Sequence, residues 1–84
     1  MTLTIKVLGP GCANCENLEK NAREAVDALA VDVTIEKVTD RAEFARYGLL
    51  YTPGLVIDEK LVAGGRIPRV AEISTWLADA AAAN

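Results

Sequence analysis

The chain has 84 residues, of which 51% are hydrophobic and 25% charged, a composition typical of one small soluble domain spanning residues 1–84. Its formal net charge of −3 and its scattered Lys and Arg residues argue against nucleic-acid binding, which would need a clustered basic face. It has no histidine, which excludes a Cys–His nucleophile pair and, with two cysteines, a four-ligand zinc site made of Cys and His.

Neither a targeting signal nor a membrane span is recognisable. The N-terminus lacks the basic stretch and apolar run of a signal peptide. No segment approaches the roughly 18 apolar residues of a membrane span. Two cysteines are too few for the disulfide framework of a secreted domain. We therefore expect a cytoplasmic protein with no membrane or nucleic-acid partner. A monomer is expected because no long exposed apolar face is predicted.

The N-terminal half predicts a strand, a helix and a second strand. Residues 3–8 alternate loosely in polarity, as in a strand, and the Gly-Pro-Gly run at 9–11 ends it. Apolar residues spaced by three and four then form one helical stripe over 15–29. Residues 31–36 alternate in polarity as a second strand. This order fits a right-handed βαβ unit with parallel strands.

A short helix is predicted next. Asp40 with Glu43 three residues later resembles a capping box that opens this helix. Gly48 is suited to closing it. Phe44 and Tyr47 lie three residues apart and are expected to pack inward.

The C-terminal part predicts a hairpin and a last helix. Strand-like runs at 54–57 and 61–63, joined by a short polar turn, predict two antiparallel strands. The last helix is expected to open near Pro68, a residue suited to a first turn, and to fray from Ala80. Its apolar stripe consists of Val70, Ile73, Leu77 and Ala80, with Trp76 beside it.

Both cysteines form a Cys-x-x-Cys pair between the first strand and the first helix. Cys12 is expected at or just before the first helical turn, where unpaired N–H groups stabilise a thiolate. Thiols in such places have pKa values lowered to roughly 3.5–7.5. Cys15, one turn further along, would be close enough to attack a disulfide formed on Cys12. A dithiol switch is the leading interpretation.

This order of elements, with Cys-x-x-Cys after the first strand and Thr-Pro before the third, resembles the thioredoxin fold. It is most similar to the small glutaredoxin-like thioredoxins of archaea and bacteria, and the resemblance covers essentially the whole chain. The resemblance is carried by three segments, Gly9–Cys15, Tyr51–Asp58 and Gly64–Pro68. It implies an α/β, thioredoxin-like three-layer fold with the order βαβ-α-ββα and a four-stranded mixed sheet.

The resemblance also implies a function, the reduction of protein disulfides, with Cys12 as nucleophile and Cys15 as resolving thiol. It implies a cis bond at Pro53, packed beside the two sulfurs, and pairing of the Thr52 backbone with an extended substrate segment. No cofactor is implied beyond the Cys12–Cys15 redox disulfide. The implied partners are disulfide-containing proteins and a thioredoxin-reductase-like electron donor. The other expected substrate contacts are Gly11, Ala13 and Asn14.

Three positions differ from these relatives. Between the cysteines stands Ala-Asn, where thioredoxins have Gly-Pro and glutaredoxins usually Pro-Tyr. Six residues before the first cysteine stands Lys6, where thioredoxins keep a buried acid. This lysine is either a solvated strand residue or a cation that lowers a thiol pKa. The Gly64-Gly65 pair is followed by Arg66 and not by the acids that bind glutathione in glutaredoxins, so glutathione use is not predicted.

A soft-metal or metalloid carrier is the alternative function. Two thiolates suit Cu(I), and small copper-chaperone domains also place Cys-x-x-Cys after their first strand. Those domains run βαββαβ and end on a strand. This chain is predicted to end on a helix over 68–80, so the sequence favours disulfide exchange.

Overall fold

The structure, a computed structural model, describes residues 3–11 and 13–83. The order of strands and helices in this part of the chain is the one expected from the sequence. The elements are β1 (Leu3–Leu8), α1 (Ala13–Leu29), β2 (Val33–Val38), α2 (Arg41–Arg46), β3 (Gly54–Ile57), β4 (Lys60–Gly64) and α3 (Val70–Ala83).

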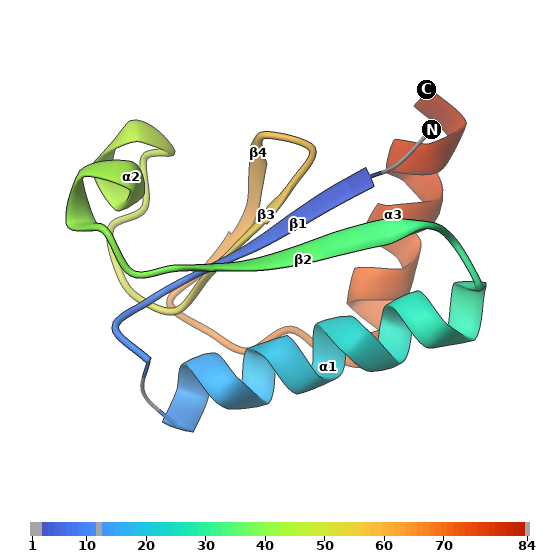
Figure 1. The fold of residues 1–84 in the computed structure, drawn as a ribbon, viewed down its shortest axis with the longest axis horizontal. Coiled ribbons are helices and arrows are strands. Elements are labelled where there is room, and N and C mark those ends of the chain that lie inside the picture. The colour runs from blue at the N-terminus through green and yellow to red at the C-terminus, as the bar shows by residue number, and fades with distance from the viewer. Residues whose placement is uncertain (1–2, 12, 84) are drawn as a thin grey trace.

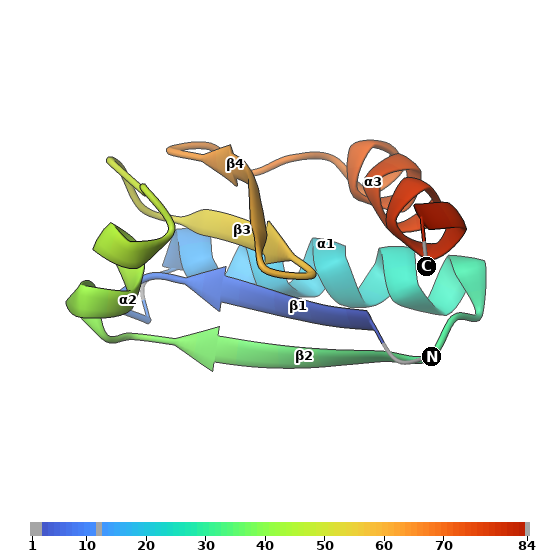
Figure 2. The ribbon, with the colours of Figure 1, turned by 90° about the horizontal axis from the view of Figure 1, so that it is seen from above.

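The four strands form one mixed sheet in the order β2-β1-β3-β4. β1 pairs in parallel with β2, while β3 runs antiparallel to both β1 and β4. α1 and α3 lie on one side of the sheet, and α2 lies on the other side near the ends of β1 and β2 (Figure 1). Figure 2 shows the strands side by side from above, with α1 behind them. This is the α/β fold that the resemblance implies.

The main core lies between the sheet and the two longer helices. β1 turns alternate side chains toward it, and Ile5 is fully buried. α1 contributes Leu18 and α3 contributes Ile73, and both are also fully buried. These residues belong to the stripes that the helical spacing predicted. Because burial of apolar surface is the dominant stabilising term, this core fixes α1 firmly against β1.

Several element boundaries differ from the predicted ones, and α3 continues to Ala83, where fraying from Ala80 is predicted. β2 begins at Val33, two residues later than expected, because its parallel register with β1 aligns Leu3 with Val33 and Leu8 with Val38. α3 begins at Val70 and not at Pro68, whose carbonyl accepts a hydrogen bond from Asn21 Nδ2 at 3.0 Å. These starting points depend on contacts with distant residues, which the polarity pattern of a single segment does not reveal.

α2 is a six-residue helix that buries none of its residues. Asp40 caps its N-terminus, accepting a hydrogen bond from the Ala42 N–H at 2.9 Å. Glu43, the other member of the predicted capping box, pairs with Arg46. Phe44 and Tyr47, which are expected to pack inward, are half-buried. The Tyr47 hydroxyl contacts Lys6 across the polar face of the sheet, at 2.7 Å from the ammonium nitrogen.

Candidate redox site

Cys15 lies in the first turn of α1 and is 6% exposed. It belongs to the core cluster that contains Val7 of β1 and Leu18 of α1. The buried stripe of α1 therefore holds this thiol in place. Cys12, the other half of the predicted pair, lies outside the described residues. The predicted substrate contacts Gly11, Ala13 and Asn14 are exposed.

Gly9 brings the backbone after β1 against the Cys15 sulfur. A Cβ built on Gly9 would lie 2.2 Å from Cys15 Sγ and 3.9 Å from the Pro53 Cα. Real Cβ atoms essentially never approach a heavy atom within 3.0 Å, so only glycine fits here without movement. The Gly9 N–H donates to the Val38 carbonyl at 3.0 Å, which fixes its backbone. The Gly-Pro-Gly run predicts the end of a strand, and nothing in that pattern indicates the contact of Gly9 with the Cys15 sulfur.

The Thr52–Pro53 segment reaches the same place from the C-terminal half. Its peptide bond is cis, as the resemblance implies. Pro53 is buried and Thr52 is exposed. The Pro53 carbonyl accepts a hydrogen bond from the Gly65 N–H at 2.9 Å. The structure thus brings Cys15 and Pro53 together on either side of Gly9, at the end of β1.

A small cavity of about 90 Å³ opens beside Cys15. That volume holds a few water molecules, since each occupies roughly 30 Å³ in the liquid. Lys37 on β2 is one of the lining residues, and its Nζ lies 3.1 Å from Glu19 Oε1. Arg23, and less strongly Lys37, lower the pKa of Glu19, which keeps this carboxylate charged and paired. The full lining is Val7, Gly9, Gly11, Cys15, Glu16, Lys37 and Thr39.

Lys6 is directed away from this cavity. It lies on the face of β1 opposite Ile5 and Val7, and its ammonium donates to Tyr47 Oη at 2.7 Å and to Glu59 Oε1 at 3.0 Å. These hydrogen bonds, first the one with Tyr47, raise the pKa of Lys6 to about 12. Lys6 is therefore a permanent cation on the face of the sheet opposite the core, where it bonds to Tyr47 at the end of α2 and to Glu59 in the β3–β4 turn.

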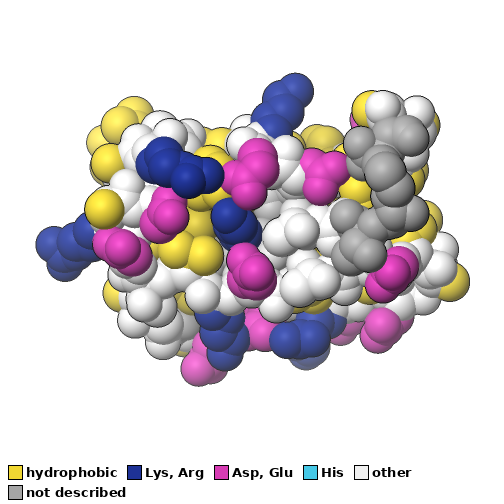
Figure 3. All heavy atoms as spheres, turned by 45° about the horizontal axis from the view of Figure 1, so that its top comes forward, with side chains coloured by type: hydrophobic (Ala, Val, Ile, Leu, Met, Phe, Trp, Pro, Cys, Tyr) yellow, Lys and Arg dark blue, Asp and Glu magenta, His cyan; other side chains and the backbone are white. Residues whose placement is uncertain are grey.

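Glu59 is the centre of this polar network. It accepts hydrogen bonds from Tyr47 and Lys6, and Arg46 donates to it at 3.1 Å. These three bonds, led by that from Tyr47, lower the pKa of Glu59 to about 2. Figure 3 shows basic and acidic side chains next to one another across this face, with no area of a single sign. We call Lys6, Arg46, Tyr47 and Glu59 the polar network.

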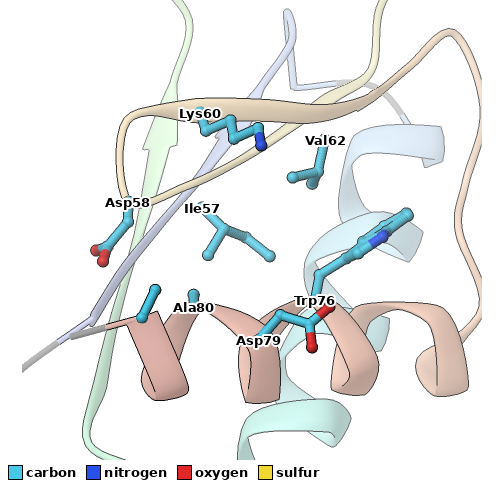
Figure 4. Close-up of a pocket in the computed structure, with 8 residues that line it drawn as sticks. Ile57, Asp58, Lys60, Val62, Trp76, Asp79 and Ala80 are labelled. Carbon is cyan, nitrogen blue, oxygen red and sulfur yellow. The ribbon is translucent and has the colours of Figure 1, made fainter.

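A second cavity, of about 310 Å³, lies between the β3–β4 hairpin and α3. Its lining includes Ile57, Lys60 and Trp76, which Figure 4 shows around the hollow. Ile57 pairs with Ile5, whereas Gly54, at the other end of β3, pairs with Leu8 beside Gly9. This cavity is therefore at the opposite end of the strands from Cys15.

Two kinds of feature are absent from the described part of the chain, a cluster of metal ligands and a membrane-spanning helix. Within residues 3–11 and 13–83, no three His, Cys, Asp or Glu side chains gather as a group able to hold a metal ion. None of the helices described there is long and apolar enough to cross a membrane.

The sequence matches the family model described as thioredoxin domain over residues 3–78. It is 43% identical over 75 residues to a thioredoxin of Methanothermobacter thermautotrophicus, a match that covers 89% of this chain and 97% of the relative. It is 39% identical over 75 residues to a thioredoxin of Methanocaldococcus jannaschii, covering 89% of this chain and 86% of the relative.

Among solved structures, the fold is similar to the J-Trx1 fragment of ERdj5. The TM-score is 0.63 at 18% identity, and the match covers 93% of this chain and 42% of that one. At that identity the likeness concerns the fold alone. The family model and the two archaeal relatives carry the assignment: the chain belongs to the thioredoxin domain family.

Proposed function

We propose that this protein reduces protein disulfides, with Cys12 as the attacking thiolate and Cys15 as the resolving thiol. Its thioredoxin relatives support thiol–disulfide oxidoreductase chemistry in general. The observation that carries the finer assignment is the burial of Cys15 in the first turn of α1, against Gly9 and near Pro53. A buried thiol is poorly placed to meet a protein substrate first, but well placed to resolve a bond formed on its neighbour.

The exchange proceeds in two displacements. The Cys12 thiolate attacks one substrate sulfur, forms a mixed disulfide and expels the other substrate sulfur as a thiolate. Cys15 loses its proton to solvent and attacks the Cys12 sulfur, which releases the second substrate thiolate and leaves the Cys12–Cys15 disulfide. The two substrate thiolates take up protons. Two electrons pass to the substrate, and a thioredoxin-reductase-like donor would return them.

The substrate would lie along the exposed rim of the site. We propose that the Thr52 backbone pairs with an extended segment around the substrate disulfide, next to Pro53. The other proposed contacts are Gly11, Ala13 and Asn14, all exposed. We also propose that the protein works in the cytoplasm as a monomer, with no bound cofactor and no nucleic-acid or membrane partner.

Trapping of the intermediate tests this function. Cys15→Ser should attack an insulin disulfide but fail to resolve it, so a mixed disulfide accumulates on non-reducing gels. Cys12→Ser should trap nothing, and the parent should reduce insulin with turnover when supplied with dithiothreitol. Equal trapping by both single variants, or by neither, would show that the two thiols do not act in this sequence.

A further inference from the structure

Leu50 and Tyr51 are the large hydrophobic residues that stand out from the described surface, at 86% and 75% exposed. They are adjacent in the connection between α2 and β3 and directly precede Thr52. A single exposed apolar residue is ordinary, but a pair of them beside a functional site indicates an interaction surface.

These two residues border an open groove of about 430 Å³. Residues of α2 line it, and so do Thr52 and Pro10, which lies in the loop that leads to the cysteines. The groove therefore borders the candidate redox site. We call it the α2 groove, and its lining is Pro10, Arg41, Phe44, Ala45, Leu49, Leu50, Tyr51 and Thr52.

The backbone on both sides of Leu50 is held in place. Leu49 packs over two paired strand glycines, since a Cβ on Gly54 or Gly64 would come within 2.6 or 2.8 Å of its Cδ1. Its N–H donates to the Phe44 carbonyl at 2.9 Å. Tyr51 lies against Gly65, where an added Cβ would be 3.1 Å from the tyrosine Cβ. A pre-ordered wall lowers the entropy cost of binding.

Arg41 supplies the charge of the groove. It is the only ionisable group of the lining apart from Tyr51. Among the described residues no carboxylate pairs with Arg41, whereas Arg46 at the other end of α2 pairs with Glu43 and Glu59. A guanidinium offers two parallel N–H donors that match a carboxylate, so an unpaired Arg beside an apolar wall favours an acidic group on the occupant.

We propose that the α2 groove selects disulfide substrates in which the reactive cysteine is flanked by an apolar residue and, beyond it, an acidic residue. The apolar side chain packs on Leu50 and Tyr51, and the carboxylate pairs with Arg41. The occupant is an extended segment because Thr52, where the substrate backbone is proposed to pair, also lines the groove. This inference rests on the proposed function and defines its substrate class.

Matched disulfide peptides test the selection. Two peptides differ only in Glu or Gln at the position beyond the apolar residue, and kcat/KM is measured for each. The parent should prefer the Glu peptide two- to fivefold, and the preference should shrink at higher ionic strength. Arg41→Gln should bring the ratio to one. Leu50→Ser should raise KM for both peptides without changing the ratio.

Arg69→Gln is the matched control, because Arg69 is also exposed and lies outside the groove lining. It should keep the parent's ratio. The parent is also assayed with bis(2-hydroxyethyl) disulfide, which is too small to fill the groove. If the parent reduces neither this compound nor insulin, the proposed function is overturned and the inference with it.

If the small disulfide is reduced but Arg41→Gln keeps the preference for Glu, or the parent has none, the groove does not select substrates in this way. A concentration-dependent dimer that Leu50→Ser disrupts would make a second copy of the chain the occupant, and would also overturn the proposal.

Discussion

The helices on the two faces of the sheet are attached to it by different interactions. On the face covered by α1 and α3, apolar side chains such as Leu18 and Ile73 have no exposed surface. On the other face, α2 buries no residue and is attached to the sheet through Tyr47 and the polar network. The Lys6–Glu59 pair in that network has side chains 17% and 58% exposed.

This difference separates the stability of the fold from the proposed selectivity of the α2 groove. Buried apolar surface contributes about 25 cal/mol per Å², whereas exposed ion pairs contribute roughly 0–1 kcal/mol each. The position of Cys15 therefore depends on the well-packed face. The position of α2, and with it the α2 groove, depends on the weaker one. Exposed residues of the groove, such as Leu50, can therefore be substituted with little loss of stability.

Truncation of a buried leucine gives the largest expected effect. Leu18→Ala removes a fully buried side chain of α1 and should lower the free energy of unfolding by about 2–5 kcal/mol. Leu50→Ala is the same chemical change at a side chain 86% exposed, and should cost less than about 0.5 kcal/mol. Urea denaturation of both variants measures the contrast. Similar losses would mean that the α2 side supports the fold as strongly as the core does.

Gly9→Ala should give the next largest effect and the most specific one. The new methyl group needs the space of Cys15 Sγ, so the thiol or the loop must move, at about 1–3 kcal/mol. Iodoacetamide labelling of Cys15, in a Cys12→Ser background, should become faster. The control is Gly64→Ala, which meets the flexible end of Leu49 and should leave Cys15 labelling slow. If Gly9→Ala leaves the rate of Cys15 labelling unchanged, Gly9 does not help to position the Cys15 thiol.

Acid should weaken the polar network. The pKa of Glu59 falls from its ordinary 4.5 to about 2 in the fold, so its stabilising contribution is complete above about pH 4.5 and is lost as the pH falls toward 2. The difference in Tm between the parent and Glu59→Gln should therefore shrink between about pH 5 and pH 2. Tyr47→Phe removes the hydrogen bond that lowers the pKa of Glu59 most. In a Tyr47→Phe background, the Tm difference caused by Glu59→Gln should therefore be smaller. If the Tm difference between the parent and Glu59→Gln does not change with pH, the ionised Glu59 does not stabilise the fold through the polar network.

Local patterns predicted most of the fold. Alternation marked residues 3–8 as a strand, and spacing of three and four marked the buried stripe of α1, because each pattern reflects one buried face. The hairpin followed from two short runs around a polar turn. Those signals need only neighbouring residues, and the structure confirms them.

What the sequence did not predict depends on contacts between distant segments. Gly9 matters because Cys15 and Pro53 converge on it, and a Gly-Pro-Gly run looks the same whether or not a sulfur lies beside it. The function of Lys6 depends on Tyr47 and Glu59, which are 41 and 53 residues away. Neither periodicity nor capping signals carry that information.

The central claim is that the two thiols differ, with Cys15 protected by the packed face and Cys12 doing the attacking. The most direct measurement is peptide mapping of the reduced protein after limiting iodoacetamide at neutral pH. We predict label mainly on Cys12, because Cys15 is 6% exposed, and equal labelling of both thiols once the protein is unfolded in urea. Equal labelling of the folded protein, or label that favours Cys15, would contradict the assignment of the two roles.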